Sequence, residues 1–321
     1  MALQALSPEY KNIIVSLGGN AIVRKGEKGT AKEQMDNLKG SCKFIAGLLV
    51  QGRSVIITHG NGPIVGNMLL RAEAALRTVP PMPLYVCDAD SEGGIGFMIQ
   101  QTLYNELKRA QSVKDIATIV TQSVVDENDP AFKNPSKPIG PFYSKKEAAL
   151  LSRKFGHTMK EDSHRGMRRF VASPRPKRII EAGVIKMLVG HGVVVIAAGG
   201  GGVPVVEDRD GALKGIDAVV DKDFATAILA KETERGLFVN LTSVDMAYAG
   251  FGTKRQKGLS RLSMGQAERL LKQGEFAEGS MAPKIESAIQ FLSSGGGEVI
   301  ITSARLIDKA LQGRAGTRIS R

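Results

Sequence analysis

Three glycine-rich turns follow short β-branched runs in this sequence, and each could bind an anion. Glycine lets backbone N–H groups converge on a phosphate, and a helix that starts just afterwards adds the positive end of its dipole. One such turn needs no more explanation than a tight connection, but three at one edge of a sheet favour a phosphate site. The turns are Leu17-Gly18-Gly19-Asn20, Thr58-His59-Gly60-Asn61-Gly62-Pro63 and Ala198-Gly199-Gly200-Gly201-Gly202.

Two common nucleotide motifs are missing from the chain. No Gly-Lys dipeptide occurs, so the Walker A pattern is absent. There is also no GxGxxG motif with an acidic residue placed for a ribose, which counts against a dinucleotide-dependent oxidoreductase.

Phosphoryl transfer needs cations fixed around the moving group and a carboxylate that orients them or holds Mg²⁺. Asp221-Lys222-Asp223 stands at a predicted helix start, where an aspartate can cap the helix while the lysine points into a ligand crevice. Lys284 also follows a predicted helix start, and Lys137 lies in a segment whose prolines restrict its backbone. A capped helix start explains the first feature equally well, and for Lys284 a surface position is the more common case, so the residues alone leave both interpretations open.

The composition indicates a globular protein with an affinity for anions. Of its 321 residues, 42% are hydrophobic and 24% charged, which excludes a disordered or fibrous chain. The net charge of +12 suits small anionic ligands as well as nucleic acid. Only 5% of the residues are aromatic and none is Trp, so stacking surfaces for nucleic acid are scarce, and we expect no nucleic-acid partner.

Cysteine usage and hydropathy predict a soluble cytoplasmic protein. Cys42 and Cys87 are too few for a disulfide framework or a thiolate zinc site. The longest apolar runs fall far short of the ~20 residues that a membrane helix needs. The opening residues lack a basic region followed by an apolar stretch, so we expect neither a secretion signal nor a membrane association.

Alternating strand and helix patterns predict an α/β fold. Buried strands are expected at 12–18, 54–60, 116–122, 193–199, 237–243 and 298–303, and helices at 31–50, 64–77, 94–109, 177–189, 222–231 and 283–292. This order implies βαβ units and a mostly parallel sheet with helices on both faces. Ligands of such sheets bind beyond the carboxyl ends of the strands.

One stretch interrupts this alternation. Residues 126–176 are rich in proline, lysine and arginine and contain a single convincing helix, at 145–154. We interpret them as an inserted subdomain that carries Lys137. Further along, Asp210-Gly211 predicts a tight β-hairpin turn.

Taken together, the motifs resemble those of the carbamate kinases of the amino-acid kinase superfamily, in the same order and along essentially the whole chain. The motif SKPIGPFY and the pattern GSMxPK are not general phosphate-loop patterns, so the resemblance is specific. The matching segments are LGGNA (17–21), ITHGNGP (57–63), DPAFKNPSKPIGPFY (129–143), AAGGGGVPVV (197–206), DAVVDKDFA (217–225), LTSVD (241–245) and GSMAPKIESAIQF (279–291).

The resemblance implies a three-layer αβα sandwich with a mostly parallel central sheet and an inserted lid. It implies one kinase domain over 1–321, with the protruding subdomain at 126–176 and the nucleotide-binding part at 221–294. It also implies a homodimer that transfers a phosphoryl group reversibly between ATP and carbamate, with Mg²⁺ carried by the nucleotide phosphates. Catabolic members run this reaction toward ATP, and no general base is needed because the carbamate oxygen is already an anion.

The same resemblance assigns roles to individual residues. Lys137, Lys222, Asp223 and Lys284 would be catalytic, with Lys137 neutralising the transferring phosphoryl group and Asp223 organising the lysines or the metal. The carbamoyl and phosphoryl groups would contact Gly18, Gly19, Asn20, Asn61, Gly62, Gly199, Gly200 and Gly201. The nucleotide would contact Lys222, Thr242, Asp245, Tyr248, Met281 and Lys284.

The chain departs from the family pattern in two places. Residues 87–94 read Cys-Asp-Ala-Asp-Ser-Glu-Gly-Gly where the family commonly has an Ala-Met-Ser-Gln-Gly-like run, and we expect the added negative charge near the dimer interface or the substrate rim. LTSVD replaces the more usual LTDVD in the nucleotide pocket. Two alternatives therefore stay open: a sibling kinase of another small carboxylate, and a non-catalytic protein that senses a nucleotide or anion on the same fold.

Overall fold

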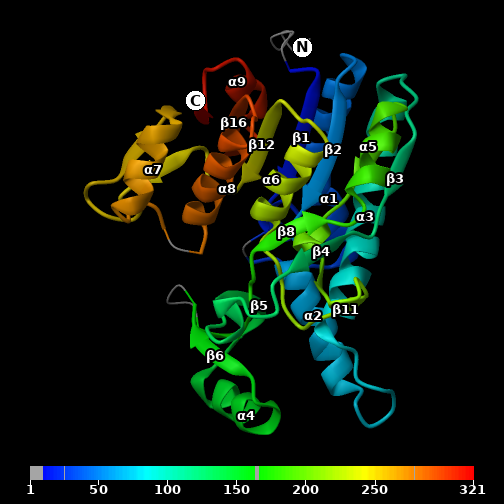
Figure 1. Cartoon of the computed structure of the whole chain (residues 1–321), viewed down its shortest axis with the longest axis vertical. Coiled ribbons are helices and arrows are strands. Elements are labelled where there is room, and N and C mark those ends of the chain that lie inside the picture. The colour runs from blue at the N-terminus through cyan, green and yellow to red at the C-terminus, as the bar shows by residue number, and fades with distance from the viewer. Residues whose placement is uncertain (1–9, 25, 163–165, 278) are drawn as a thin grey trace.

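A computed structural model describes residues 10–24, 26–162, 166–277 and 279–321. Its centre is an eight-stranded sheet in which every neighbouring pair runs parallel except β16 with β17 (Figure 1). The spatial order is β15 (Arg261–Ser263), β17 (Thr317–Ser320), β16 (Glu298–Ser303), β12 (Leu237–Thr242), β1 (Asn12–Leu17), β2 (Ser54–His59), β9 (Val194–Ile196) and β3 (Ile116–Thr118).

The register of the central strands brings their turns together. Leu17 on β1 pairs with His59 on β2 and with Leu241 on β12. Because these strands are parallel and end at the same level, the turns after them leave the sheet side by side.

Helices cover both faces of the sheet, as strand alternation requires. On β1, Ile13 and Val15 pack into one hydrophobic core, whereas Ile14 packs into the other. The first core takes residues from α1 (Ala31–Val50), α3 (Leu84–Arg109) and α9 (Ile307–Leu311), and the second from α5 (Ala182–Gly190), α6 (Lys222–Glu232), α7 (Met264–Lys272) and α8 (Met281–Ser293). The expected three-layer αβα sandwich is confirmed.

A second sheet of four strands flanks the first. Its order is β11 (Leu213–Gly215), β10 (Val203–Glu207), β4 (Gln122–Val125) and β8 (Pro176–Ile179). Strands β10 and β11 form an antiparallel hairpin, so the hairpin predicted at Asp210-Gly211 is confirmed. Two further elements are β13 (Ala247–Ala249) and β14 (Lys257–Leu259), which pair with each other, and short 3-10 turns lie at η1 (Gly19–Ala21), η2 (Pro130–Phe132) and η3 (Gly199–Gly201).

Three predicted elements have wrong limits. The strand expected at 116–122 is two strands, β3 and β4, which belong to different sheets. The helix expected from 177 starts at Ala182, because residues before it pair with β4 as strand β8. The helix expected from 94 starts at Leu84, since Cys87, Asp88, Ser91, Glu92 and Ile95 are all buried along one helical face, and this burial outweighs the low helix propensity of the two glycines after Glu92.

Within 126–176, strands β5 (Lys137–Tyr143), β7 (Met167–Val171) and β6 (Thr158–Glu161) form a sheet of their own, with α4 (Lys145–Phe155) beside it. Figure 1 shows β5, β6 and α4 at the end of the molecule below the central sheet. Helix α2 (Gly62–Ala74) touches β5 closely, since a Cβ on Gly66 would lie 2.0 Å from the Gly140 nitrogen. Helix α2 therefore sets the position of the strand that begins with Lys137.

No helix in the described part of the chain is long and apolar enough to cross a membrane.

Candidate functional site

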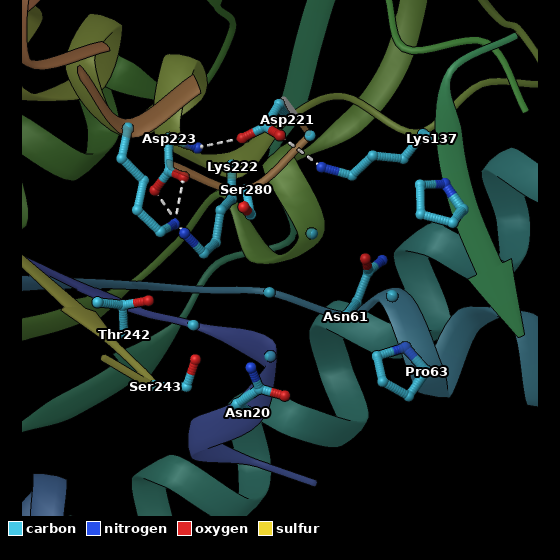
Figure 2. A pocket seen from close by; sticks show the side chains of 18 of the residues that line it. Asn20, Asn61, Pro63, Lys137, Asp221, Lys222, Asp223, Thr242, Ser243 and Ser280 are labelled. Atoms are coloured by element: carbon cyan, nitrogen blue, oxygen red, sulfur yellow. Dashed lines mark hydrogen bonds and ion pairs between the residues drawn. The ribbon is translucent and has the colours of Figure 1, made fainter. Parts of the chain in front are cut away.

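A cavity of about 320 Å³ lies at the carboxyl ends of β1, β2 and β12 (Figure 2). The turns that follow these strands form its floor, the N-termini of α6 and α8 contribute charged side chains, and Lys137 reaches it from β5. The lining residues are Gly18, Gly19, Asn20, Gly60, Asn61, Gly62, Pro63, Lys137, Pro138, Arg168, Gly200, Asp221, Lys222, Asp223, Thr242, Ser243, Gly279, Ser280 and Lys284.

Asp221 combines a structural and an electrostatic role. It is the N-cap of α6, and one of its carboxylate oxygens accepts the Asp223 backbone N–H at 2.9 Å. The other oxygen lies 2.5 Å from Lys137 Nζ. Burial alone would raise the pKa of Asp221, but the charges of Lys137 and Lys222 and the hydrogen bond from Lys137 together hold that pKa below its usual value.

Asp223 holds two further lysines in the cavity wall. Its carboxylate accepts hydrogen bonds from Lys222 Nζ at 2.5 Å, Lys284 Nζ at 2.7 Å and Asn240 Nδ2 at 2.7 Å. Figure 2 shows Lys222 and Asp223 on the side of the cavity away from Lys137. The lysines lower the pKa of Asp223 despite its burial, so it is a carboxylate at neutral pH.

The two lysines have different pKa values. Burial lowers the pKa of Lys222 to about 8, although Asp223 acts in the opposite direction, and the positive charge of Lys284 lowers it further. For Lys284 burial also lowers the pKa, but the charges of Asp223 and Asp221 and the hydrogen bond to Asp223 together outweigh this effect, and the pKa is raised. The cavity thus holds one firmly charged lysine beside one that titrates at mildly alkaline pH.

Glycine is required where the turns touch. A Cβ on Gly18 would lie 2.9 Å from the Leu241 carbonyl oxygen, and one on Gly60 would lie 3.0 Å from the Gly19 nitrogen. Gly200 has a φ of +66°, a conformation that side chains other than glycine rarely adopt. Any larger residue would separate these turns and open the floor of the cavity.

Behind the floor, α3 supplies two buried acids. Asp88 accepts a hydrogen bond from Asn61 Nδ2 at 3.0 Å, and Glu92 accepts the backbone N–H of Gly199 at 3.1 Å. Burial raises the pKa of both carboxyl groups well above their usual values. We expected the negative charge of segment 87–94 on a rim or dimer surface; the structure instead places Asp88 and Glu92 in the interior, while Asp90 is exposed.

The cavity brings together most of the residues named from the sequence. Those that line it are Gly18, Gly19, Asn20, Asn61, Gly62, Lys137, Gly200, Lys222, Asp223, Thr242 and Lys284.

Five other residues named from the sequence lie outside the cavity lining. Gly199 and Gly201 flank Gly200 but are buried against His59 and Val220. Three more come from the nucleotide set. The Asp245 carboxylate is bonded to Ser303 and Arg305, Tyr248 lies on β13 near Phe251, and Met281 is buried at the start of α8.

Sequence reasoning missed two charged residues of the cavity. Asp221 was considered only as part of a capping motif, yet it is the partner of Lys137. Arg168 on β7 is not among the candidates named from the sequence, but it lines the cavity and donates to the Gly140 carbonyl at 3.1 Å. The alternation of side chains along β7 could have distinguished Arg168 from its neighbour Arg169, which binds Glu73 on α2.

His59 does not act as a base at this site. It is fully buried, and burial lowers its pKa to about 4, so the ring is neutral at physiological pH. Its ring instead packs where a Cβ on Gly199 would be, which supports a structural role.

Comparison with known proteins identifies the family. The sequence profile of the amino acid kinase family matches residues 11–303. The carbamate kinase of Pyrococcus furiosus is 45% identical over 311 residues, which cover 96% of this chain and 99% of that protein.

Solved structures of carbamate kinases have the same fold as this chain. Carbamate kinase from Giardia lamblia bound to citric acid superposes with a TM-score of 0.91 at 40% identity, over 97% of this chain and 98% of that one. The same enzyme bound to AMP-PNP gives a TM-score of 0.88 at 40% identity, with the same coverage. With its three-layer fold and its lysine-lined cavity, this chain belongs to the amino acid kinase family, in the carbamate kinase branch.

Proposed function

We propose that the protein is a carbamate kinase that catalyses ATP + carbamate ⇌ ADP + carbamoyl phosphate. The observation that carries this function is the arrangement of Lys137, Lys222 and Lys284 around one cavity, held by Asp221 and Asp223. Full-length relatives named carbamate kinase support the choice of substrate.

The reaction needs no proton transfer. Toward ATP, the bond between phosphorus and the carbamoyl oxygen breaks, its electron pair stays on carbamate, and a β-phosphate oxygen of ADP forms the new bond to phosphorus. Charge and atoms balance without an added proton. The described residues that line the cavity include no histidine, and its carboxylates are bound to lysines. Such a site suits this chemistry, because the remaining requirement is positioning and stabilisation of charge.

The lysines divide this work by position. Lys137 comes from β5, opposite the other two, and would neutralise the transferring phosphoryl group. Lys222 and Lys284 stand at the N-termini of α6 and α8, where they would bind nucleotide phosphates together with the helix dipoles. Asp221 and Asp223 are positioning residues for the lysines. The backbone of the glycine turns, including Gly199 and Gly201, would complete the phosphate cradle.

The nucleotide enters as its Mg²⁺ complex. The two cavity aspartates are already bound to lysines, and the described residues contain no cluster of three or more metal-binding side chains. This donor set fits a Mg²⁺ ion held mainly by phosphate oxygens and water, its usual environment with nucleotides. AMP-PNP bound to the Giardia enzyme supports the use of a nucleotide. In this chain the nucleotide would lie beside Thr242, Asp245, Tyr248 and Met281.

We extend the proposal to organisation and cellular role. Residues 126–176 would form the subdomain that carries Lys137, and 221–294 the nucleotide-binding part of one kinase domain. The physiological direction would be toward ATP, in catabolism. Cys42 and Cys87 are free and buried, which is consistent with a cytoplasmic location.

A homodimer is the proposed assembly. On α3, the Phe97 and Tyr104 side chains are each about half exposed, next to the edge strand β3, and this apolar surface would suit an interface. Sedimentation at decreasing concentration tests the assembly.

The function is tested by mixing purified protein with Mg-ADP and carbamoyl phosphate and measuring ATP. ATP formation that depends on Lys137 supports the proposal. Turnover with acetyl phosphate and Mg-ADP, or with acetylglutamate and Mg-ATP, would instead favour the sibling kinase. Nucleotide binding without turnover on any of these substrates would favour the sensor.

A further inference from the structure

The side-chain amide of Asn61 has a defined orientation. Its nitrogen donates one hydrogen to Asp88 Oδ1 at 3.0 Å and the other to Ser91 Oγ at 2.9 Å. Both donors of the amide are therefore used on the side facing α3.

Ser91 shows that the amide cannot simply be reversed. The Ser91 hydroxyl donates its only hydrogen to the Asp88 carbonyl oxygen at 2.8 Å, so toward Asn61 it can only accept. A reversed amide would place Asn61 Oδ1 against that acceptor and against the Asp88 carboxyl oxygen. Ser91 opposes this reversal in either protonation state of Asp88.

The oxygen of the same amide faces the cavity. Asn61 lines the cavity, and within the described part of the chain no residue donates a hydrogen bond to its Oδ1. Figure 2 shows the amide projecting from the start of α2 into the open space between Lys137 and Asn20. Gly200 packs against it from behind, since a Cβ there would lie 2.1 Å from Asn61 Nδ2.

Other side-chain oxygens of the cavity, on Asn20, Thr242, Ser243 and Ser280, can also accept a hydrogen bond, but the Asn61 amide is held in one orientation by the bonds of both its N–H groups. The cavity is otherwise lined largely by groups that bind phosphate, namely the lysines, Arg168 and the glycine turns, and its two carboxylates are bound to lysines. Asn61 Oδ1 thus offers a free acceptor suited to a substrate N–H.

We propose that Asn61 Oδ1 accepts a hydrogen bond from the carbamoyl NH₂ group, and that Asp88 and Ser91 are positioning residues that keep this oxygen turned to the substrate. The inference rests on the proposed function and adds the basis of its specificity. Acetyl phosphate has a methyl group where carbamoyl phosphate has NH₂, so it leaves Asn61 Oδ1 buried without a donor. A site built to accept a hydrogen bond discriminates against a ligand that lacks the donor.

The first experiment compares the two acyl phosphates on the full-length protein. With Mg-ADP present, kcat/KM is measured for carbamoyl phosphate, and acetyl phosphate is measured as a substrate or, if it is not turned over, as a competitive inhibitor. In Asn61→Leu we expect kcat/KM for carbamoyl phosphate to fall about tenfold or more, while the constant for acetyl phosphate changes little. Asn61→Ala provides the same comparison if the leucine variant does not fold.

Further variants test whether Asp88 and Ser91 position the Asn61 amide. Asp88→Asn keeps an oxygen that can accept from Asn61, so we expect the preference for carbamoyl phosphate to be retained. Ser91→Ala combined with Asp88→Leu removes both acceptors, and the preference should fall toward that of Asn61→Leu. Asp90→Asn is the matched control on the same helix, because Asp90 is exposed and should leave the preference unchanged.

The outcomes distinguish a failure of the role given to Asn61 from a failure of the kinase function. If Asn61→Leu weakens carbamoyl phosphate and acetyl phosphate equally, Asn61 has only a structural role and the inference is overturned while the kinase function stands. If the unmodified protein forms no ATP from carbamoyl phosphate, the proposed function fails, and the inference that depends on it fails too.

Discussion

Lys137 and Asp221 are 84 positions apart in the chain, yet Lys137 Nζ lies 2.5 Å from Asp221 Oδ2. The pair connects strand β5, which lies outside the central sheet, to the N-terminus of helix α6, which packs on the central sheet. Its lysine side chain is 26% exposed, so a ligand phosphate can reach it. Asp221 thus holds the Lys137 ammonium at the cavity wall.

Replacing Lys137 with alanine should lower kcat by about a hundredfold or more, the size of effect seen when one preorganised charge donor is removed. The fold should be retained, because a partly exposed ion pair contributes little stability. Lys133→Ala is the matched control, since Lys133 is an exposed lysine of the same segment that does not line the cavity. Unchanged turnover in Lys137→Ala would show that the lysine does not act on the phosphoryl group.

Asp223→Asn should destabilise the fold by about 3–5 kcal/mol, because it leaves two buried lysines without their counter-charge. Urea unfolding followed by circular dichroism measures the change. Asp36→Asn is the comparison: Asp36 also binds two lysines, Lys32 and Lys39, but on the exposed face of α1, and its loss should have little effect. Equal effects of the two substitutions would contradict the buried network described here.

The pH dependence should follow Lys222. Its pKa is lowered to about 8, chiefly by burial, so the ammonium loses its proton as the pH rises through that value and the cavity loses a positive charge. We expect kcat/KM for ADP to decline above about pH 8, whereas bound phosphate should move the corresponding decline in kcat to higher pH. The phosphate groups are already ionised in this range and contribute no decline of their own.

Lys222→Arg supplies the control, because a guanidinium stays charged throughout this range. The activity of this variant can be lower, but its kcat/KM for ADP should stay constant above about pH 8, where that of the unmodified protein declines. A level profile to pH 9.5 in the unmodified protein would rule out Lys222 as the titrating group.

Gly66→Ala should impair catalysis from outside the cavity. A Cβ at this position would lie 2.0 Å from the Gly140 nitrogen, so α2 and β5 must separate and Lys137 must move with β5. A displacement of about 1 Å can cost a factor of about 100 in rate. Gly40→Ala on α1 has open space around its Cβ and should leave the rate unchanged. A fully active Gly66→Ala would show that this contact does not position Lys137.

Much of the cavity was predictable because its signals are local. Each glycine turn follows a strand that is recognisable from its own residues, and parallel strands must end at a common edge. Lys137, Lys222 and Lys284 could be named because helix starts and proline-restricted segments are short-range features. Their roles required the resemblance to a family, because spacing alone did not distinguish a phosphate ligand from a surface lysine.

The interior acids were not predictable in the same way. Asp88 and Glu92 read as added surface charge, since carboxylates are seldom buried without a partner. Asp88 binds Asn61, from the turn after β2, and Glu92 binds the Gly199 N–H, from η3. These partners are distant in the sequence, so the pairing can be recognised only once the packing of α3 is known. The same applies to β8, which read as the start of a helix until its pairing with β4 was known.

The sequence by itself therefore determined the α/β class, the family, and the lysines and most of the glycines that line the cavity, because turn chemistry and hydrophobic periodicity act over a few residues. Tertiary structure alone decided which aspartate holds Lys137, that Asp88 and Glu92 of α3 face inward, and which atom of the Asn61 amide is turned away from α3. Those properties depend on contacts between residues far apart in the chain, where the available hydrogen-bond donors and acceptors, rather than local preference, decide the geometry.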